Sequence, residues 1–154
     1  MVDLELLIIR VIRSIMPVKI VTNKFDEFLI SKDTIRVYKG DKLIFSSREE
    51  RLKPLLEYAA RFKPYEKNVT VYDRVVGNAA ALLLKKIHCS EVFSQLGSEA
   101  AVLALDSFGI KYHFNEIVLC ILDDTRLNIC PMEKMSTGKT SEEFYKLMSE
   151  PRRC

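Results

Sequence analysis

The sequence predicts a single α/β domain whose mixed sheet combines an antiparallel hairpin with parallel strands. The chain has 154 residues, 48% of them hydrophobic, which suits one compact core. Two alternating runs, 34–38 and 42–46, flank the turn residues Gly40-Asp41, a pattern typical of a β-hairpin. From residue 91 onward, strand-like and helix-like stretches alternate. That alternation indicates crossover connections and therefore parallel strands.

The first part of the chain is expected to be an amphipathic N-terminal segment, residues 1–24, followed by one domain over residues 25–150. Leu, Ile and Val dominate residues 4–21, but Arg10, Arg13 and Lys19 interrupt the run. A signal peptide places its basic residues first, and a membrane-spanning helix needs about 20 apolar residues. Neither pattern is present. We therefore expect no membrane partner and a segment that packs on the domain or on another protein.

Charge and cysteine spacing narrow the class of function. The net charge is only +3, and basic residues gather in short clusters such as 85–86 and 152–153, so we expect no nucleic-acid partner. The cysteines at 89, 120, 130 and 154 have no Cys-x-x-Cys spacing. This favours free thiols, a reducing cytoplasmic location, and neither a metal nor another cofactor. A homo-oligomer is compatible with these features.

Several further elements follow from residue patterns. Residues 25–30 and 49–62 have helical periodicity, and Pro64 ends the second helix. Residues 69–72 and 91–96 are strand-like, with Gly97 expected to break the latter, and 111–114 forms another strand; 115–122 fits either strand or helix. Ser98 and Gly109 are suited to begin and end a helix. A Thr-x-x-Glu pattern from Thr140 predicts a last helix.

The central helix is expected over residues 73–87, which are apolar on almost every side. Asp73 is predicted as its N-cap, because a carboxylate there accepts backbone N–H groups and lies at the positive end of the helix dipole. Gly77 and the alanines at 79–81 form a small-residue patch that a ligand could approach closely. Asn78 and Ser98, each near a predicted helix start, are further candidates for ligand hydrogen bonds.

Cys130 is the strongest candidate for chemistry. It precedes Pro131 at a predicted helix start, where the helix dipole and free N–H groups stabilise a thiolate, and the thiolate is the nucleophilic form. The alternative is a small apolar residue that fills a turn. Glu133, three residues later, is either a general base or the third helical residue that completes the cap.

The runs Asp73-Arg-Val-Val-Gly-Asn-Ala-Ala-Ala and Cys130-Pro-Met-Glu, with the Gly-Asp hairpin upstream, resemble a small prokaryotic family of unknown function whose fold is similar to that of cytidine deaminases. The resemblance covers residues 25–148 and implies a three-layer α/β/α domain with a mixed sheet. Zinc deaminases carry His-x-Glu and Pro-Cys-x-x-Cys at two helix starts. Here those positions read Gly77-Asn78-Ala79 and Leu96-Gly97-Ser98, so zinc-dependent deamination is not expected.

Two functional hypotheses remain open. In the first, the protein is a thiol-dependent enzyme acting on a small, nucleotide-like molecule, with Cys130 as nucleophile and Asp73 or Glu133 as its polar partner. In the second, it is a non-catalytic module that binds a small ligand or another protein. Both hypotheses place the pocket between the start of the central helix, the Gly97-Ser98 turn and the Cys130 helix start.

Overall fold

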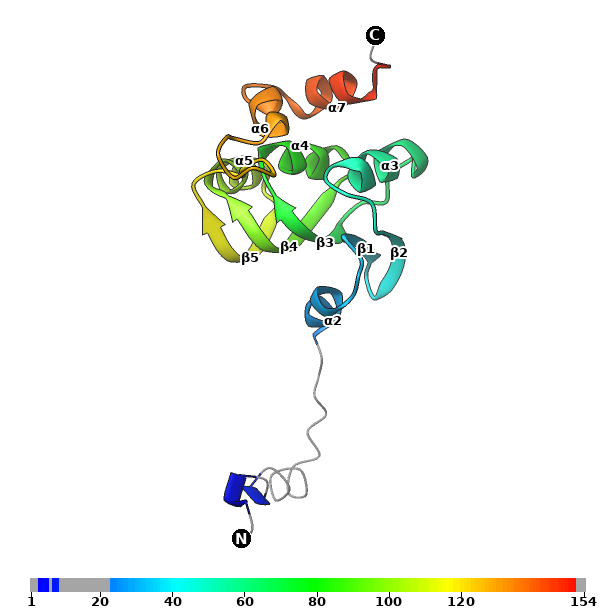
Figure 1. Cartoon of the computed structure of the whole chain (residues 1–154). Coiled ribbons are helices and arrows are strands. Elements are labelled where there is room, and N and C mark those ends of the chain that lie inside the picture. The colour runs from blue at the N-terminus through cyan, green and yellow to red at the C-terminus, as the bar shows by residue number, and fades with distance from the viewer. Residues whose placement is uncertain (1–2, 6, 9–22, 152–154) are drawn as a thin grey trace.

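A five-stranded mixed sheet forms the centre of the protein, in the order β2-β1-β3-β4-β5 (Figure 1). The structure is a computed structural model and describes residues 3–5, 7–8 and 23–151. Strand β1 (Ile35–Lys39) pairs antiparallel with β2 (Lys42–Ser47) and with β3 (Val69–Val76). Strands β4 (Cys89–Ser98) and β5 (Lys111–Val118) continue the sheet parallel to β3. The predicted combination of a hairpin and parallel strands is therefore confirmed.

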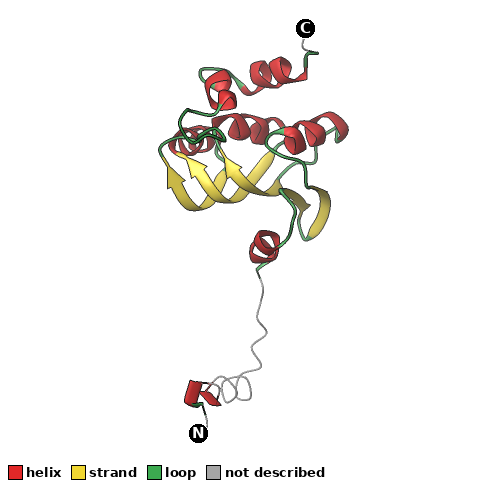
Figure 2. Ribbon diagram, viewed as in Figure 1, coloured by secondary structure: helices red, strands yellow, loops and turns green. Residues whose placement is uncertain are grey.

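Helices lie on both faces of the sheet (Figure 2). Helix α2 (Lys24–Ile30) lies on one face, and α3 (Lys53–Arg61), α4 (Asn78–Lys86) and α5 (Glu99–Phe108) lie on the other. Helices α6 (Pro131–Ser136) and α7 (Ser141–Ser149) pack against the outer side of α4. This arrangement fits the three-layer α/β/α class.

Strand β3 separates two clusters of the core, because alternate side chains of a strand point to opposite faces. Val71 is fully buried on the face covered by α4. Tyr72 points to the other face, where its ring lies 5.7 Å from that of Phe25 and 6.0 Å from that of Phe28. The strand therefore anchors α2 on one side and supports α4 on the other.

Turn and cap residues behave largely as the sequence predicts. Gly40, in the β1–β2 turn, and Gly109, after α5, adopt positive φ angles of 57° and 70°. Oγ of Ser98 accepts a hydrogen bond from the backbone N–H of Ala101 at 3.1 Å, and Thr140 caps α7 in the same way through the N–H of Glu143. The short-range rules for starting and ending helices are confirmed at these sites.

Two local predictions are wrong. The central helix begins at Asn78, not at Asp73, because residues 69–76 complete the sheet between β1 and β4, with Asp73 opposite Ile35 and Ser94. Its N-cap is Gly77. Gly97 does not end its strand either. It lies within β4, where a β-carbon would be 2.7 Å from Cγ of Phe114, so glycine leaves the space that this ring occupies.

The N-terminal segment expected over residues 1–24 falls mainly on positions 1–2, 6 and 9–22, which lie outside the described residues. Leu4, Leu7 and Ile8 are described and exposed. Among the residues that the structure describes, no helix combines the length and apolar character needed to cross a membrane.

Candidate functional site

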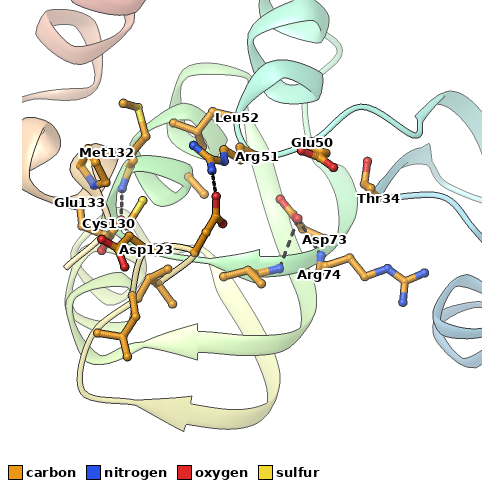
Figure 3. Close-up of a pocket in the computed structure, with 18 of the residues that line it drawn as sticks. Thr34, Glu50, Arg51, Leu52, Asp73, Arg74, Asp123, Cys130, Met132 and Glu133 are labelled. Atoms are coloured by element: carbon orange, nitrogen blue, oxygen red, sulfur yellow. Dashed lines mark hydrogen bonds and ion pairs between the residues drawn. The ribbon is translucent and has the colours of Figure 1, made fainter. Parts of the chain in front are cut away.

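A pocket of about 560 Å³ opens beside the carboxyl end of β3 (Figure 3). Four segments form its wall: the loop before α3, the end of β3, the start of α4, and residues 121–133. Most of the accessible surface of the wall is apolar, although nine of the nineteen lining residues are polar or charged. The wall includes seven charged residues, a glycine and a cysteine: Glu50, Arg51, Asp73, Arg74, Gly77, Asp123, Asp124, Cys130 and Glu133.

Asp73 lies within β3, on the same face of the sheet as Val71, and its side chain borders the pocket. It is only 9% exposed. Oδ1 accepts hydrogen bonds from the backbone N–H groups of Arg74, at 2.7 Å, and Val75, at 3.4 Å. No donor from the described residues reaches Oδ2. This oxygen is therefore available to a molecule in the pocket.

Burial raises the pKa of the Asp73 carboxyl to about 7, because the ionised form loses its solvation. The two backbone N–H donors and the charge of Arg74 lower the pKa, but these effects are smaller than the desolvation. Near neutral pH the group is therefore divided between a protonated form, which can donate a hydrogen bond, and an ionised form, which only accepts.

Glu133 caps a helix other than its own. Its Oε2 accepts from the backbone N–H of Asn78 at 2.9 Å, and its Oε1 accepts from that of Ala79 at 3.2 Å. These are two of the N–H groups that the first turn of α4 leaves without an intrahelical partner. The carboxylate is 8% exposed and lies at the positive end of the α4 dipole. Both of its oxygens are therefore engaged in holding α6 against α4.

Gly77 makes this cap possible. A β-carbon at residue 77 would lie 2.8 Å from Oε2 and 2.5 Å from Cδ of Glu133, closer than real β-carbons approach such atoms. The backbone of Gly77 has φ −98° and ψ −172°, which any residue adopts, so the requirement for glycine here is one of space. Part of the small-residue patch expected for a ligand is thus filled by the protein's own carboxylate.

Asn78 and Ser98, predicted as ligand contacts, make hydrogen bonds within the fold. Nδ2 of Asn78 donates to Oγ of Ser136 at 2.9 Å and to its backbone oxygen at 3.2 Å. Ser98 is fully buried and caps α5. Neither residue lines the pocket, whereas Gly77, Cys130 and Asp73 do. The structure therefore brings only part of the predicted site together.

Cys130 occupies the predicted N-cap position of α6 and lines the pocket with partial exposure. Its side chain makes no capping hydrogen bond. Figure 3 places Cys130 and Glu133 together in one part of the pocket and Asp73 in another. Since Glu133 is bound to α4, the predicted pairing of thiol with carboxylate is not formed by this residue in the structure.

The mouth of the pocket contains residues that local sequence patterns did not single out. Arg51, before α3, forms an ion pair with Asp124, which lies in the loop of a short hairpin. That hairpin is closed by a bridge between Leu122 and Ile129. A hydrogen bond from the hydroxyl of Thr125 is the main cause that lowers the pKa of the neighbouring Asp123 carboxyl. The Asp123 carboxyl at the mouth is therefore ionised at neutral pH.

Arg74 contributes to the lining, but its guanidinium group serves another part of the fold. It donates to the backbone oxygens of Phe28, Leu29, Ser31 and Asp33 at distances between 2.7 and 3.1 Å. These carbonyls lie at the end of α2 and in the loop that follows. Figure 3 shows the side chain of Arg74 extending away from Asp73.

Residues 24–150 match the family model described as a domain of unknown function, DUF1893. The chain belongs to this family. A crystal structure of a DUF1893 family protein from Thermotoga maritima is similar, with 24% sequence identity and a TM-score of 0.75 over 86% of this chain and 90% of that chain. At this identity the likeness supports the fold of the DUF1893 domain alone. No curated protein matches the chain.

Proposed function

We propose that this DUF1893 domain binds a small molecule in the Asp73 pocket, with Oδ2 of Asp73 as the hydrogen-bonding anchor. One observation carries this proposal: a side chain that is 9% exposed keeps one oxygen without a protein donor from the described residues, and that side chain borders a cavity. Oδ2 keeps contact with the solvent of the pocket, so a ligand that carries a hydrogen-bond donor can take the place of water there. The volume, about 560 Å³, falls in the usual range for small-molecule sites.

A screen of chemically diverse fragments by ligand-observed NMR tests this proposal. Fragments that occupy the pocket should bind the natural chain, and binding should weaken in Asp73→Asn. Asp41→Asn is the matched control, since that carboxylate is exposed in the β1–β2 turn. Binding unchanged by Asp73→Asn, or an absence of binding throughout the library, contradicts the proposal.

Catalysis by Cys130 is a second candidate, favoured by the presence of its partly exposed thiol on the wall of the same pocket. In this proposal Cys130 is the nucleophile and Asp73, not Glu133, is the polar partner that contacts the substrate. Single-cysteine variants provide the test. An activated Cys130 should react with iodoacetamide faster than Cys120, which is also partly exposed, and equal rates contradict the proposal.

A cytidine-deaminase-like arrangement remains a proposal, supported by the two motifs and by a mixed sheet flanked by helices. The zinc of deaminases does not fit the residues present. Gly77, Asn78 and Ala79 stand at one helix start and Gly97 and Ser98 at the next, and none supplies a thiolate or imidazole. The described residues also hold no group of three His, Cys, Asp or Glu side chains placed to bind a metal ion. We therefore assign no step to zinc.

We also propose a cytoplasmic location, which is supported by the free thiols of Cys89, Cys120 and Cys130. A homo-oligomer is proposed as well. Light scattering coupled to size-exclusion chromatography measures the molecular mass in solution, and a monomeric mass at high protein concentration contradicts the homo-oligomer.

A further inference from the structure

The charges around the pocket are unequal. Acidic side chains occupy five lining positions, whereas two guanidinium groups are the only basic side chains in the described lining. The acidic residues are Glu50, Asp73, Asp123, Asp124 and Glu133. Arg51 is paired with Asp124, and Arg74 is engaged by the carbonyls after α2. Arg74 therefore cannot turn to a ligand without losing these hydrogen bonds, and the charge of the exposed Arg51 is offset by Asp124 beside it.

The N-terminal end of α4, which could also attract an anion, already binds the Glu133 carboxylate. The start of α4 points two N–H groups toward the pocket region, which is the usual seat for a phosphate. Glu133 accepts both of these N–H groups through its carboxylate. A phosphate at this position would have to displace a buried carboxylate, and it would then lie among other acidic groups. The structure thus disfavours the nucleotide-like ligand that the sequence suggested.

Asp73 favours a ligand that donates a hydrogen bond over a ligand that is an anion. Its unoccupied Oδ2 accepts an N–H donor, and an ionised carboxylate binds a cationic donor more strongly than a neutral one. Leu52, Val75 and Met132 supply apolar surface elsewhere on the pocket wall, so a ligand can combine a polar group at Asp73 with an apolar ring or chain.

We propose that the pocket selects a compact, phosphate-free molecule that directs an N–H group of amidine or amine type at Oδ2 of Asp73, and that it excludes anions. This inference rests on the proposed binding function. It adds the chemical class of the ligand: an apolar ring or chain that carries a neutral or positively charged nitrogen group.

Benzamidine, benzamide and benzoate test the inference, because they share one ring and differ in carrying a positive, no or a negative charge. Inorganic phosphate is the fourth probe. Ligand-observed NMR at pH 7.5 on the full chain should give an affinity for benzamidine about tenfold or more above that for benzoate, with benzamide between them. Phosphate should not bind. In Asp73→Asn the preference for benzamidine should disappear, whereas Asp41→Asn should retain it.

Benzoate or phosphate binding as tightly as benzamidine overturns the inference while leaving the proposed binding function in place. Failure of all four probes also overturns the inference. The diverse fragment screen then decides the binding function separately. The charge series in the natural chain requires no substitution, so a variant that fails to fold does not remove the test.

Discussion

Glu133 and Gly77 should be energetically coupled, because the carboxylate of Glu133 occupies the space that a side chain at residue 77 would need. Glu133→Ala removes the acceptors of two backbone N–H groups at the start of α4. Losing a cap costs about 1 kcal/mol, and hydrogen bonds to a charged group contribute about 1.5–3 kcal/mol each. We expect the free energy of unfolding to fall by about 3 kcal/mol, which for a domain of this size lowers Tm by roughly 6–12 °C.

Gly77→Ala should cost nearly as much in the natural chain, because its β-carbon expels the carboxylate from both N–H groups. In the Glu133→Ala background the same substitution should cost less than about 1 kcal/mol, since alanine then enters empty space and only the preference of an N-cap for glycine over alanine remains. The coupling energy is therefore about 2 kcal/mol, within the range observed for contacting residues.

Urea denaturation followed by far-ultraviolet circular dichroism measures all four chains, since the protein contains no tryptophan. Glu143→Ala, an exposed carboxylate on α7, serves as the control and should change the free energy of unfolding by less than about 1 kcal/mol. If Gly77→Ala costs the same with and without Glu133, the carboxylate does not occupy the position described and the reasoning is refuted.

Three further predictions concern the floor of the pocket and the sheet around it. The pKa of Asp73 is raised in the fold, so between about pH 4 and 7 the native state keeps a proton that the unfolded chain has lost. As the pH rises through this window, the free energy of unfolding should fall by up to about 1.4 kcal/mol per pH unit. Asp73→Asn should remove this slope, which urea titrations at several pH values measure. An unchanged slope in the variant contradicts the assignment. Arg74→Leu deprives the carbonyls after α2 of their donors and should lower the free energy of unfolding by about 3 kcal/mol or more. Arg48 is largely exposed, so the control Arg48→Ala should lower it by less than about 1 kcal/mol. Equal losses of stability in thermal unfolding would exclude this role of Arg74. Gly97→Ala should lower Tm, because its β-carbon clashes with the ring of Phe114. In the Phe114→Ala background the same substitution should lower Tm much less, since the ring is gone. Additive losses of Tm would exclude the clash.

The sequence predicted well those elements that depend on neighbouring residues. The Gly40-Asp41 turn, the Ser98 cap and the positive φ angle at Gly109 are set within a few positions of the chain, and each is found where expected. Alternation of strands and helices likewise predicted the parallel part of the sheet.

Features that depend on distant segments were harder to predict. Asp73 has the residue type and spacing of an N-cap, but pairing with β1 and β4 extends the strand through it, and no local pattern distinguishes the two outcomes. Glu133 has the spacing of a cap for its own helix, yet the position of α4 determines which N–H groups it reaches. The pair Arg51 and Asp124 joins residues 73 positions apart, which single-sequence patterns cannot anticipate.

The Glu133 cap also has a consequence for the order in which parts of the structure can form. The first turn of α4 leaves the ribosome long before residue 133, so its N–H groups must remain with water until α6 arrives. A contact across 55 positions requires the closure of a long loop and forms late. We therefore expect amide protons at the start of α4 to gain protection from hydrogen exchange only when α6 docks, together with the closing of the pocket wall.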